Sequence, residues 1–403
     1  MLSQAGLEKA KVHRGATDPD SWRRGDILNL ALSYRSMLDL AVGVILVALA
    51  TSLGWGMRGE WGHWWGATVP GALCGMTLWL SYGEAQDVWQ MVVLAAVMAA
   101  SISLGGVLSY GKIVGYVKGQ HERSPSFGLF GLFLVGGLWG FFGGVGLGLA
   151  TSGLCYGVGD LALWGTIAFT GAYLANKLLV LGLDFHLSPP RHDAWAPVLG
   201  AAVSTAAYLA LLKGDISALV TALVGWVGFG GGFCIGALIH RWCVSAGLWL
   251  DSWKFMEHSV GFWGGLSLAA VVALRGGSIA PLPVGDASRL ASALLVFFLV
   301  PYMNLTNTAQ YWFSEAKFIT RKTFAVIQVI CLVLFAASAL AFLSFSRSLR
   351  SVEGGPVIFS LYSGLLIVLA VAKFRFSTAR QRLAIDATFV GHLVICLLLL
   401  TFL

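Results

Sequence analysis

Apolar runs of about 20 residues follow one another along most of the chain, and this recurrence limits the possible fold more than any other feature. A helix needs about 20 mostly apolar residues to cross the hydrocarbon core of a bilayer. Twelve stretches have this character: 36–54, 64–82, 88–110, 126–150, 161–183, 194–213, 216–239, 255–274, 289–313, 323–345, 357–373 and 383–402. The strands of a membrane barrel are about half as long and alternate apolar with polar residues. The sequence therefore predicts an all-α, polytopic transmembrane helical bundle.

The low charge content also indicates a lipid environment. Only 11% of the 403 residues are charged, against about a quarter in a soluble domain, so the outside of the fold must face lipid. The net charge is +7, but the basic residues lie in scattered short loops and form no nucleic-acid-binding patch. The six cysteines include no Cys-x-x-Cys pair, which argues against a zinc site or a disulfide framework. We expect the lipid bilayer as the partner, no nucleic acid and no cofactor.

The positions of Lys and Arg predict which loops are cytoplasmic. Counting back from the C-terminus, alternation places these basic residues inside: Lys373, Arg375, Arg380, Arg382, Lys317, Arg321, Lys322, Arg241, Lys254, Arg191, Lys112, Lys118 and Arg123. Twelve full crossings would leave the basic N-terminal tail outside. A re-entrant or broken segment near 54–82, where Gly and Pro interrupt the run, removes this conflict. The sequence thus favours 11 crossings over 12, in the cytoplasmic (inner) membrane, with a cytoplasmic N-terminus.

Glycine divides the chain unevenly. Residues 36–313 contain 44 of the 51 glycines, whereas residues 314–403 contain four. Small residues allow helices to approach closely in lipid. We therefore expect a cytoplasmic N-terminal tail at 1–35, a Gly/Trp-rich transmembrane core at 36–313 and Gly-poor C-terminal helices at 314–403. The last group either shields the core or supports a homo-oligomer.

An unusual group of charged and aromatic residues lies within 54–70. It comprises Arg58, Glu60, Trp61, His63 and Trp64. Charges at membrane depth cost at least a few kcal/mol each, so they are normally paired or line a wet cavity. The pattern predicts a site where Glu60 and His63 carry protons or bind a ligand, Arg58 holds an anion, and tryptophans form the walls. The alternative is an interfacial loop, because tryptophans also collect at membrane boundaries.

A second polar group occupies one helical face. Lys254, Glu257, His258, Gly261 and Gly265 follow a spacing of three or four residues. The glycines allow a neighbouring helix to pack there, so Glu257 and His258 should point into the protein, where they would suit a proton relay. In the structural alternative, Lys254 marks the helix end and pairs with Glu257. The group lacks the ligands that a metal ion needs.

Amides and hydroxyls follow Pro301 at the end of an apolar run. Proline leaves a carbonyl without its partner and can kink a helix, so Asn304 and Asn307 are candidate contacts for a polar solute. The pattern favours the structural alternative, in which they satisfy backbone groups and end the span. His392, in the last run, is interpreted as a hydrogen-bonded packing residue.

The buried charges predict a transporter or channel for a small polar solute, anionic in view of Arg58, with protons as the coupling ion if there is one. The alternatives are a membrane-embedded enzyme acting on a lipid-linked or sugar-like substrate, with His63 or His258 as base, and a structural subunit of a membrane complex. No catalytic residue is assigned, because the sequence contains no nucleophile elbow, metal triad or phosphate loop. A cavity open to one side of the membrane and lined by Arg58 and Glu257 would favour transport. A sideways opening would favour the enzyme, and a solid core the structural subunit.

Overall fold

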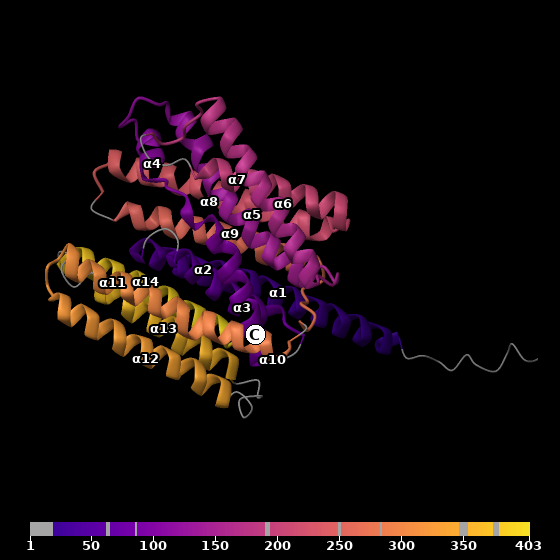
Figure 1. The fold of residues 1–403 in the computed structure, drawn as a ribbon. Helices are drawn as coiled ribbons and strands as arrows, with labels where there is room; N and C mark the ends of the chain where they lie inside the picture. Colours follow the sequence, from indigo (N-terminus) through magenta and orange to yellow (C-terminus); the bar gives the residue numbers. More distant parts are fainter. Residues whose placement is uncertain are drawn as a thin grey trace, which may run out of the picture.

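The fold is helical throughout the part of the chain that can be described. The computed structural model describes residues 19–61, 65–84, 87–189, 194–248, 251–282, 284–345, 354–373 and 379–403. Within these ranges, ten helices are long and apolar enough to span a membrane. The β-type pairing within these ranges is limited to a single bridge between Gly83 and Ile279. The chain is an all-α, polytopic membrane protein, which confirms the predicted fold class (Figure 1).

Each of the twelve predicted runs contains a helix. The α-helices are α1 (Pro19–Trp61), α2 (Thr68–Tyr82), α3 (Val88–Ser103), α4 (Gly111–Val117), α5 (Pro125–Thr151), α6 (Val158–Ala175), α7 (Trp195–Ala207), α8 (Ile216–Ser245), α9 (Ser252–Leu274), α10 (Asp286–Ala293), α11 (Val300–Ser314), α12 (Arg321–Phe345), α13 (Gly354–Lys373) and α14 (Ala379–Leu400). Short π-helical turns continue α6 and α7 and join α10 to α11. Of these α-helices, α4 alone lies outside the predicted runs, because it is too short to span a membrane.

Acidic side chains fix where several helices begin. The carboxylate of Asp87 accepts a hydrogen bond from the backbone N–H of Trp89 at 2.9 Å. Asp215 accepts from the N–H of Ala218, also at 2.9 Å, and Asp251 caps α9 in the same way. Such caps satisfy N–H groups that have no partner within the helix. The starts of these helices therefore follow from local sequence.

The first two helices form an antiparallel hairpin. A Cβ added at Gly54 would lie 2.5 Å from Cα of Pro70, and one at Gly43 would lie 3.0 Å from the ring of Tyr82. Helix α1 ends at Trp61, and α2 runs back along α1 toward its beginning. The predicted break within 54–82 is confirmed. Helix α2 returns beside α1 as far as Gly43, so of the two predicted forms the structure has the broken segment, and the number of crossings stays a prediction.

Labelling with a membrane-impermeant maleimide tests this arrangement. Helix α5 separates the exposed Glu122 from the exposed Cys155, so Cys155 and a Glu122→Cys variant made without Cys155 should react from opposite sides. The basic loop before α5 predicts that position 122 is cytoplasmic. Because α1, α2, α3 and α5 pack antiparallel in turn, Leu38→Cys should react from the side of Cys155. Reaction from the side of position 122 would instead support the predicted cytoplasmic N-terminus.

Close backbone contacts confirm the glycine-packed core. A Cβ at Gly140 of α5 would lie 2.0 Å from the carbonyl oxygen of Gly225 of α8, and a Cβ at Gly225 would lie 2.3 Å from that of Gly140. The neighbouring Phe229 is fully buried. The same type of contact joins α1 to α9 at Gly261, which packs on Thr51. Small residues thus let the central helices touch through their backbones.

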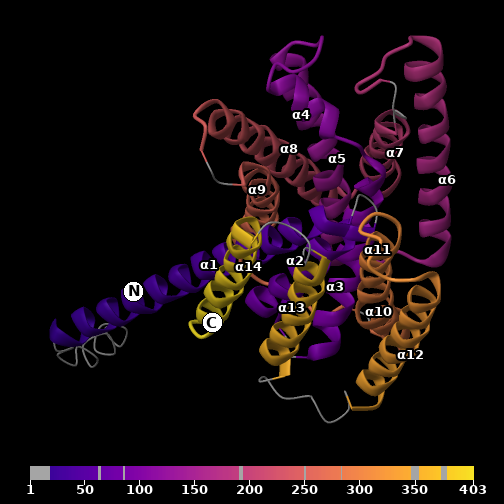
Figure 2. The same ribbon diagram turned by 90° about the vertical axis from the view of Figure 1, so that its left-hand side faces the viewer.

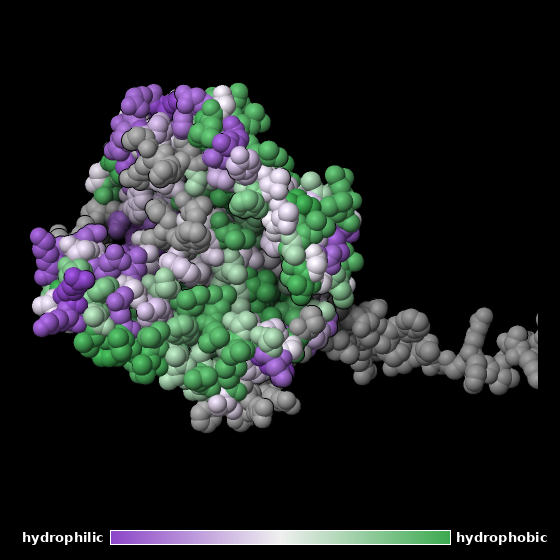
Figure 3. All heavy atoms as spheres, viewed as in Figure 1, coloured by the Kyte–Doolittle hydropathy of each residue, from purple (hydrophilic) through white to green (hydrophobic). Residues whose placement is uncertain are grey.

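The last helices lie beside the central ones. Helices α13 and α14 run along the side of α1, and α12 is the outermost helix of this group (Figure 2). The surface drawn in Figure 3 is apolar over this group, and hydrophilic side chains gather toward the ends of α11 and α12. This distribution is expected of helices whose outer faces contact lipid. The predicted division at residue 314 stays a prediction.

Candidate functional site

Lys254 lies at the centre of a buried charge network between α1 and α9. Its ammonium forms an ion pair with Glu60 of α1 and another, at 2.6 Å, with Glu257 of its own helix. It also donates a hydrogen bond to the backbone oxygen of Gly56 at 3.1 Å. The predicted pair between Lys254 and Glu257 therefore exists, but it is one part of a contact between helices. An ammonium group has three N–H donors, so these three acceptors use all of them.

Glu257 is held from a second direction by aromatic donors. The indole N–H of Trp253 donates to Oε1 of Glu257 at 3.0 Å, and the hydroxyl of Tyr110 donates to the same oxygen at 3.4 Å. The hydroxyl of Tyr110 in turn accepts from Arg58 at 2.7 Å. The network thus continues from the carboxylate of Glu257 through Tyr110 to a second cation, Arg58 of α1. Charges at this depth are satisfied by such contacts because water does not reach them.

Aromatic rings surround the guanidinium of Arg58. Its Cζ atom lies 4.7 Å from the ring centroid of Trp139, 5.1 Å from that of Tyr110 and 5.4 Å from that of Trp55. Cation–π attraction is strongest where the cation is desolvated, and Arg58 is almost completely buried. Arg58 therefore makes its contacts within the protein and does not line the cavity, and its expected role as a holder of an anion stays a prediction.

Two glycines of α1 make room for the polar side chains of α9. A Cβ at Gly59 would lie 2.2 and 2.3 Å from the carboxylate oxygens of Glu257. A Cβ at Gly56 would lie 2.5 Å from Cε1 of His258. Glu257 and His258 are both buried and point into the protein, as the spacing in the sequence predicts. Gly56 and Gly59 therefore serve close packing between helices.

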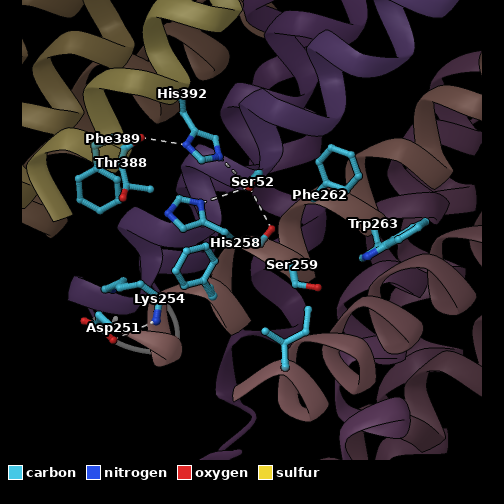
Figure 4. Close-up of a pocket in the computed structure, with 12 residues that line it drawn as sticks. Ser52, Asp251, Lys254, His258, Ser259, Phe262, Trp263, Thr388, Phe389 and His392 are labelled. Carbon is cyan, nitrogen blue, oxygen red and sulfur yellow. Dashed lines mark hydrogen bonds between the residues drawn. The ribbon is translucent and has the colours of Figure 1, made fainter. Parts of the chain in front are cut away.

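A cavity of about 520 Å³ lies next to this network. Its lining residues come from α1, α8, α9 and α14: Ser52, Ile239, Asp251, Lys254, Phe255, His258, Ser259, Phe262, Trp263, Thr388, Phe389 and His392. The volume is typical of ligand sites, which measure about 300–1,000 Å³. In Figure 4, Asp251 and Lys254 lie at one end, Phe262 and Trp263 lie at the other, and the imidazoles lie between them. Neither Arg58 nor Glu257 lines it.

The cavity opens sideways. Phe255 and Trp263 of α9 are 49% and 39% exposed, and Ile239 of α8 is 38% exposed, and all three belong to the lining. These side chains lie in helices that are apolar enough to span a membrane, so we expect their exposed faces to contact lipid. We therefore expect the opening to face the bilayer rather than water. By the expectation drawn from the sequence, such an opening favours a membrane-embedded enzyme over a transporter.

A histidine pair forms the polar middle of the cavity wall. The rings of His258 and His392 stack with centroids 4.5 Å apart and planes inclined by 18°. The hydroxyl oxygen of Ser52 lies 3.2 Å from Nδ1 of His258 and 3.3 Å from Nε2 of His392 (Figure 4). Nδ1 of His392 lies 2.9 Å from the backbone oxygen of Thr388. His392 is hydrogen-bonded and packed against His258, in agreement with its interpretation, and it also lines the cavity.

The remaining predicted site residues that the structure describes make hydrogen bonds within the protein. The indole of Trp61 donates to the hydroxyl of Thr308 at 3.0 Å. The amide of Asn304 donates to the backbone oxygen of Val300 at 2.8 Å, which is the structural alternative expected for it. Asn307 accepts from Lys373 at 3.4 Å, and Lys373 also donates to the backbone oxygen of Glu60. His63 and Trp64 lie outside the described residues.

No sequence pattern assigns a role to Ser52 or Tyr110, and Lys373 is predicted only to lie in a cytoplasmic loop. Ser52 and Tyr110 carry no charge and stand in ordinary apolar surroundings, so no local signal marks them. Lys373 had a weak signal, because its cation directly follows an apolar run.

Within the described ranges, no three His, Cys, Asp or Glu side chains lie close enough together to hold a metal ion. Comparison with protein-family profiles, with curated proteins and with solved structures finds no match to this chain.

Proposed function

We propose that the protein is a membrane transporter whose substrate occupies the cavity between α1, α8, α9 and α14. The position of Lys254 carries this proposal. Lys254 lines the cavity and also joins α1 to α9 through its ion pair with Glu60. A substrate in the cavity would therefore contact the residue that holds the two helices together. A transporter needs such a link, because a substrate changes a conformational equilibrium only if it binds the two states differently.

The charge network would act as a gate at the start of α9. The ion pair between Lys254 and Glu60 closes the contact between the two helices beside the cavity. In alternating access, one group of helices rocks against another around a fixed site. Opening would separate α1 from α9, while Glu257 keeps its bonds to Trp253 and Tyr110. The network therefore contains both a contact that can break and donors that hold the remaining charge.

A flux assay in proteoliposomes tests transport. Uptake of radiolabelled uncharged and anionic solutes would be measured, with a pH-sensitive dye inside to report coupled protons, for the wild type and for the double variant Lys254→Met/Glu60→Gln. We expect the double variant to reduce the initial rate at least tenfold, because a change of about 1.4 kcal/mol in one equilibrium is already tenfold. The matched control is Lys213→Met/Asp160→Asn, which removes an ion pair away from the cavity and should leave the rate unchanged.

The proposal fails if wild-type protein moves no solute faster than empty liposomes do. It also fails if the two double variants have the same flux. Size-exclusion chromatography of both variants establishes that they are folded, so a lost rate is assigned to the gate. The two variants replace one cation and one carboxylate each, so they do not differ in overall charge.

A membrane-embedded enzyme is the second candidate, and the sideways opening of the cavity favours it. Two groups argue against a reactive site. The hydroxyl of Ser52 donates to the backbone oxygen of His258 at 3.0 Å, and Nε2 of His258 is sealed from solvent against Gly56. Both residues line the cavity, but the proton of Ser52 is held by a backbone oxygen and Nε2 of His258 is buried, so these two groups are poorly placed to act as nucleophile and base. Mass spectrometry that finds a lipid converted to a new product, without any flux, would replace transport by catalysis.

A further inference from the structure

We propose that the substrate is a membrane-dissolved amphiphile with an uncharged polar head and an apolar chain. This inference rests on the proposed function, because it names the ligand class of the same cavity. In this arrangement the head lies beside Ser52 and His392, and the chain extends along Phe262 and Trp263. The molecule enters from the bilayer between α9 and α14.

The length of the cavity and the sequence of its lining indicate an elongated, two-part ligand. Asp251 precedes the first turn of α9, and Trp263 lies twelve residues further along, which corresponds to about 18 Å of helix. The lining changes along this length from charged, through imidazole and hydroxyl, to aromatic. A small polar solute would leave the aromatic part of the cavity in contact with water. An apolar chain would cover it and gain about 25 cal/mol per Å² of apolar surface buried.

The charges at the cavity argue for an uncharged head. Among the described lining residues, Lys254 and Asp251 are the charged ones. All three donors of Lys254 are used by Glu60, Glu257 and the backbone oxygen of Gly56. Asp251 caps the N-terminus of α9, where the helix dipole favours a negative charge. An anionic head would therefore meet an ammonium whose donors are all used, and a cationic head would meet only a carboxylate already engaged as a helix cap, so either charge would be poorly compensated in the membrane, at a cost of several kcal/mol.

The exposed rim argues for entry from the bilayer. Phe255, Trp263 and Ile239 are large apolar side chains at the opening, and each is between 38% and 49% exposed. Such residues face lipid without cost, whereas an aqueous entrance would be lined by polar side chains. An amphiphile already dissolved in the bilayer can slide its chain between α9 and α14 and keep that chain out of water throughout.

Photo-crosslinking in nanodiscs tests the ligand class with the full-length protein. Three probes carry the same twelve-carbon chain with a terminal diazirine and differ only in the head: a hydroxyl, a sulfonate or a trimethylammonium group. Mass spectrometry of peptides then locates the crosslinks. We expect the hydroxyl probe to label Phe262, Trp263 or Phe389 at least fivefold more than either charged probe. Helix α6, where Phe169 is 75% exposed, measures labelling by simple contact with bilayer-dissolved probe.

A matched pair of variants controls for the site of entry. Ile239→Trp places a larger side chain at the opening and should lower labelling of Phe262 and Trp263 at least fivefold. Ile235→Trp lies one turn away on the same helix, is 39% exposed in the wild type and does not line the cavity, so it should change nothing. Equal reduction by both variants would contradict entry at Ile239.

Three other results would overturn the inference. One is labelling by a charged probe that equals or exceeds labelling by the hydroxyl probe. Another is labelling of the cavity that is no stronger than labelling of α6. The third is protection of the cavity by glycerol, which has hydroxyl groups but no chain. Failure of transport is a separate result. Flux of a small polar solute without labelling of the cavity would support a transporter and reject the amphiphile as its substrate. Labelling of the cavity without flux would support the binding site and reject transport.

Discussion

Replacing Lys254 with methionine is expected to lower the free energy of unfolding by about 3 to 5 kcal/mol, the range found when one partner of a buried ion pair is removed. The change leaves the carboxylates of Glu60 and Glu257 close together without their shared cation. Both carboxylates are buried, so water cannot take the place of the ammonium. Equilibrium unfolding of the purified protein in mixed detergent measures the effect.

A double-mutant cycle separates the ion pair from the packing of the lysine side chain. Glu60→Gln removes the partner on α1, and in the Lys254→Met/Glu60→Gln variant only Glu257 remains charged, with Trp253 and Tyr110 as donors. We therefore expect the double variant to be more stable than Lys254→Met alone, with an interaction energy of about 0.5 to 3 kcal/mol. Strictly additive effects would show that the two residues do not interact.

The partly exposed pair between Lys213 and Asp160 supplies the comparison. Its ammonium and carboxylate lie 2.9 Å apart, but both side chains remain accessible to solvent. Water and ions replace such a contact when one partner is removed, so Lys213→Met should change stability little. A loss in this variant as large as in Lys254→Met would mean that burial does not explain the role of Lys254.

Replacing Gly140 with alanine is expected to destabilise the core by about 1 to 3 kcal/mol, the usual cost of overpacking. The new methyl group would lie 2.0 Å from the carbonyl oxygen of Gly225, and backbone cannot rotate away as a side chain can. Helices α5 and α8 would have to separate along the contact. Unfolding in mixed detergent measures the effect, and Gly225→Ala should act similarly because its Cβ would lie 2.3 Å from the oxygen of Gly140.

Gly231, on the same helix α8, is the matched control. Nothing lies within 4 Å of a Cβ at this position, so Gly231→Ala has no clash to relieve. Alanine forms helices more readily than glycine by about 1 kcal/mol, and the variant should be unchanged or slightly more stable. If Gly140→Ala were as well tolerated as Gly231→Ala, close backbone contact would not be what the glycines provide.

The sequence by itself determined the helices and several local contacts. The length and apolar character of the twelve runs predicted the membrane helices, because each span must bury its own backbone hydrogen bonds in lipid. Spacing along one helix predicted that Glu257 and His258 point inward and offered the pair with Lys254. These predictions depend on helix geometry, which repeats every few residues. Because this geometry is the same in every helix, it can be read from a single sequence.

Other predictions depended on features that one sequence does not contain. The contact between α1 and α2 shows the broken segment, which the sequence did not separate from a re-entrant one, because helices of similar composition can turn back or re-enter with the same residues. Arg58 was expected to bind an anion, but three rings from two other parts of the chain and its own helix surround it. The roles of His63 and Trp64, which lie outside the described residues, stay predictions.

Only the tertiary structure decided which distant residues share the site. His258 and His392 are 134 positions apart, and Ser52 lies more than 200 positions before either of them, yet the three side chains meet at the cavity wall. Lys254 finds Glu60 across a similar separation in the sequence. Hydrophobic periodicity fixes which face of a helix turns inward but not which other helix it meets. That choice depends on how closely the backbones approach, and here glycines at particular positions of α1, α5, α8 and α9 set the approach.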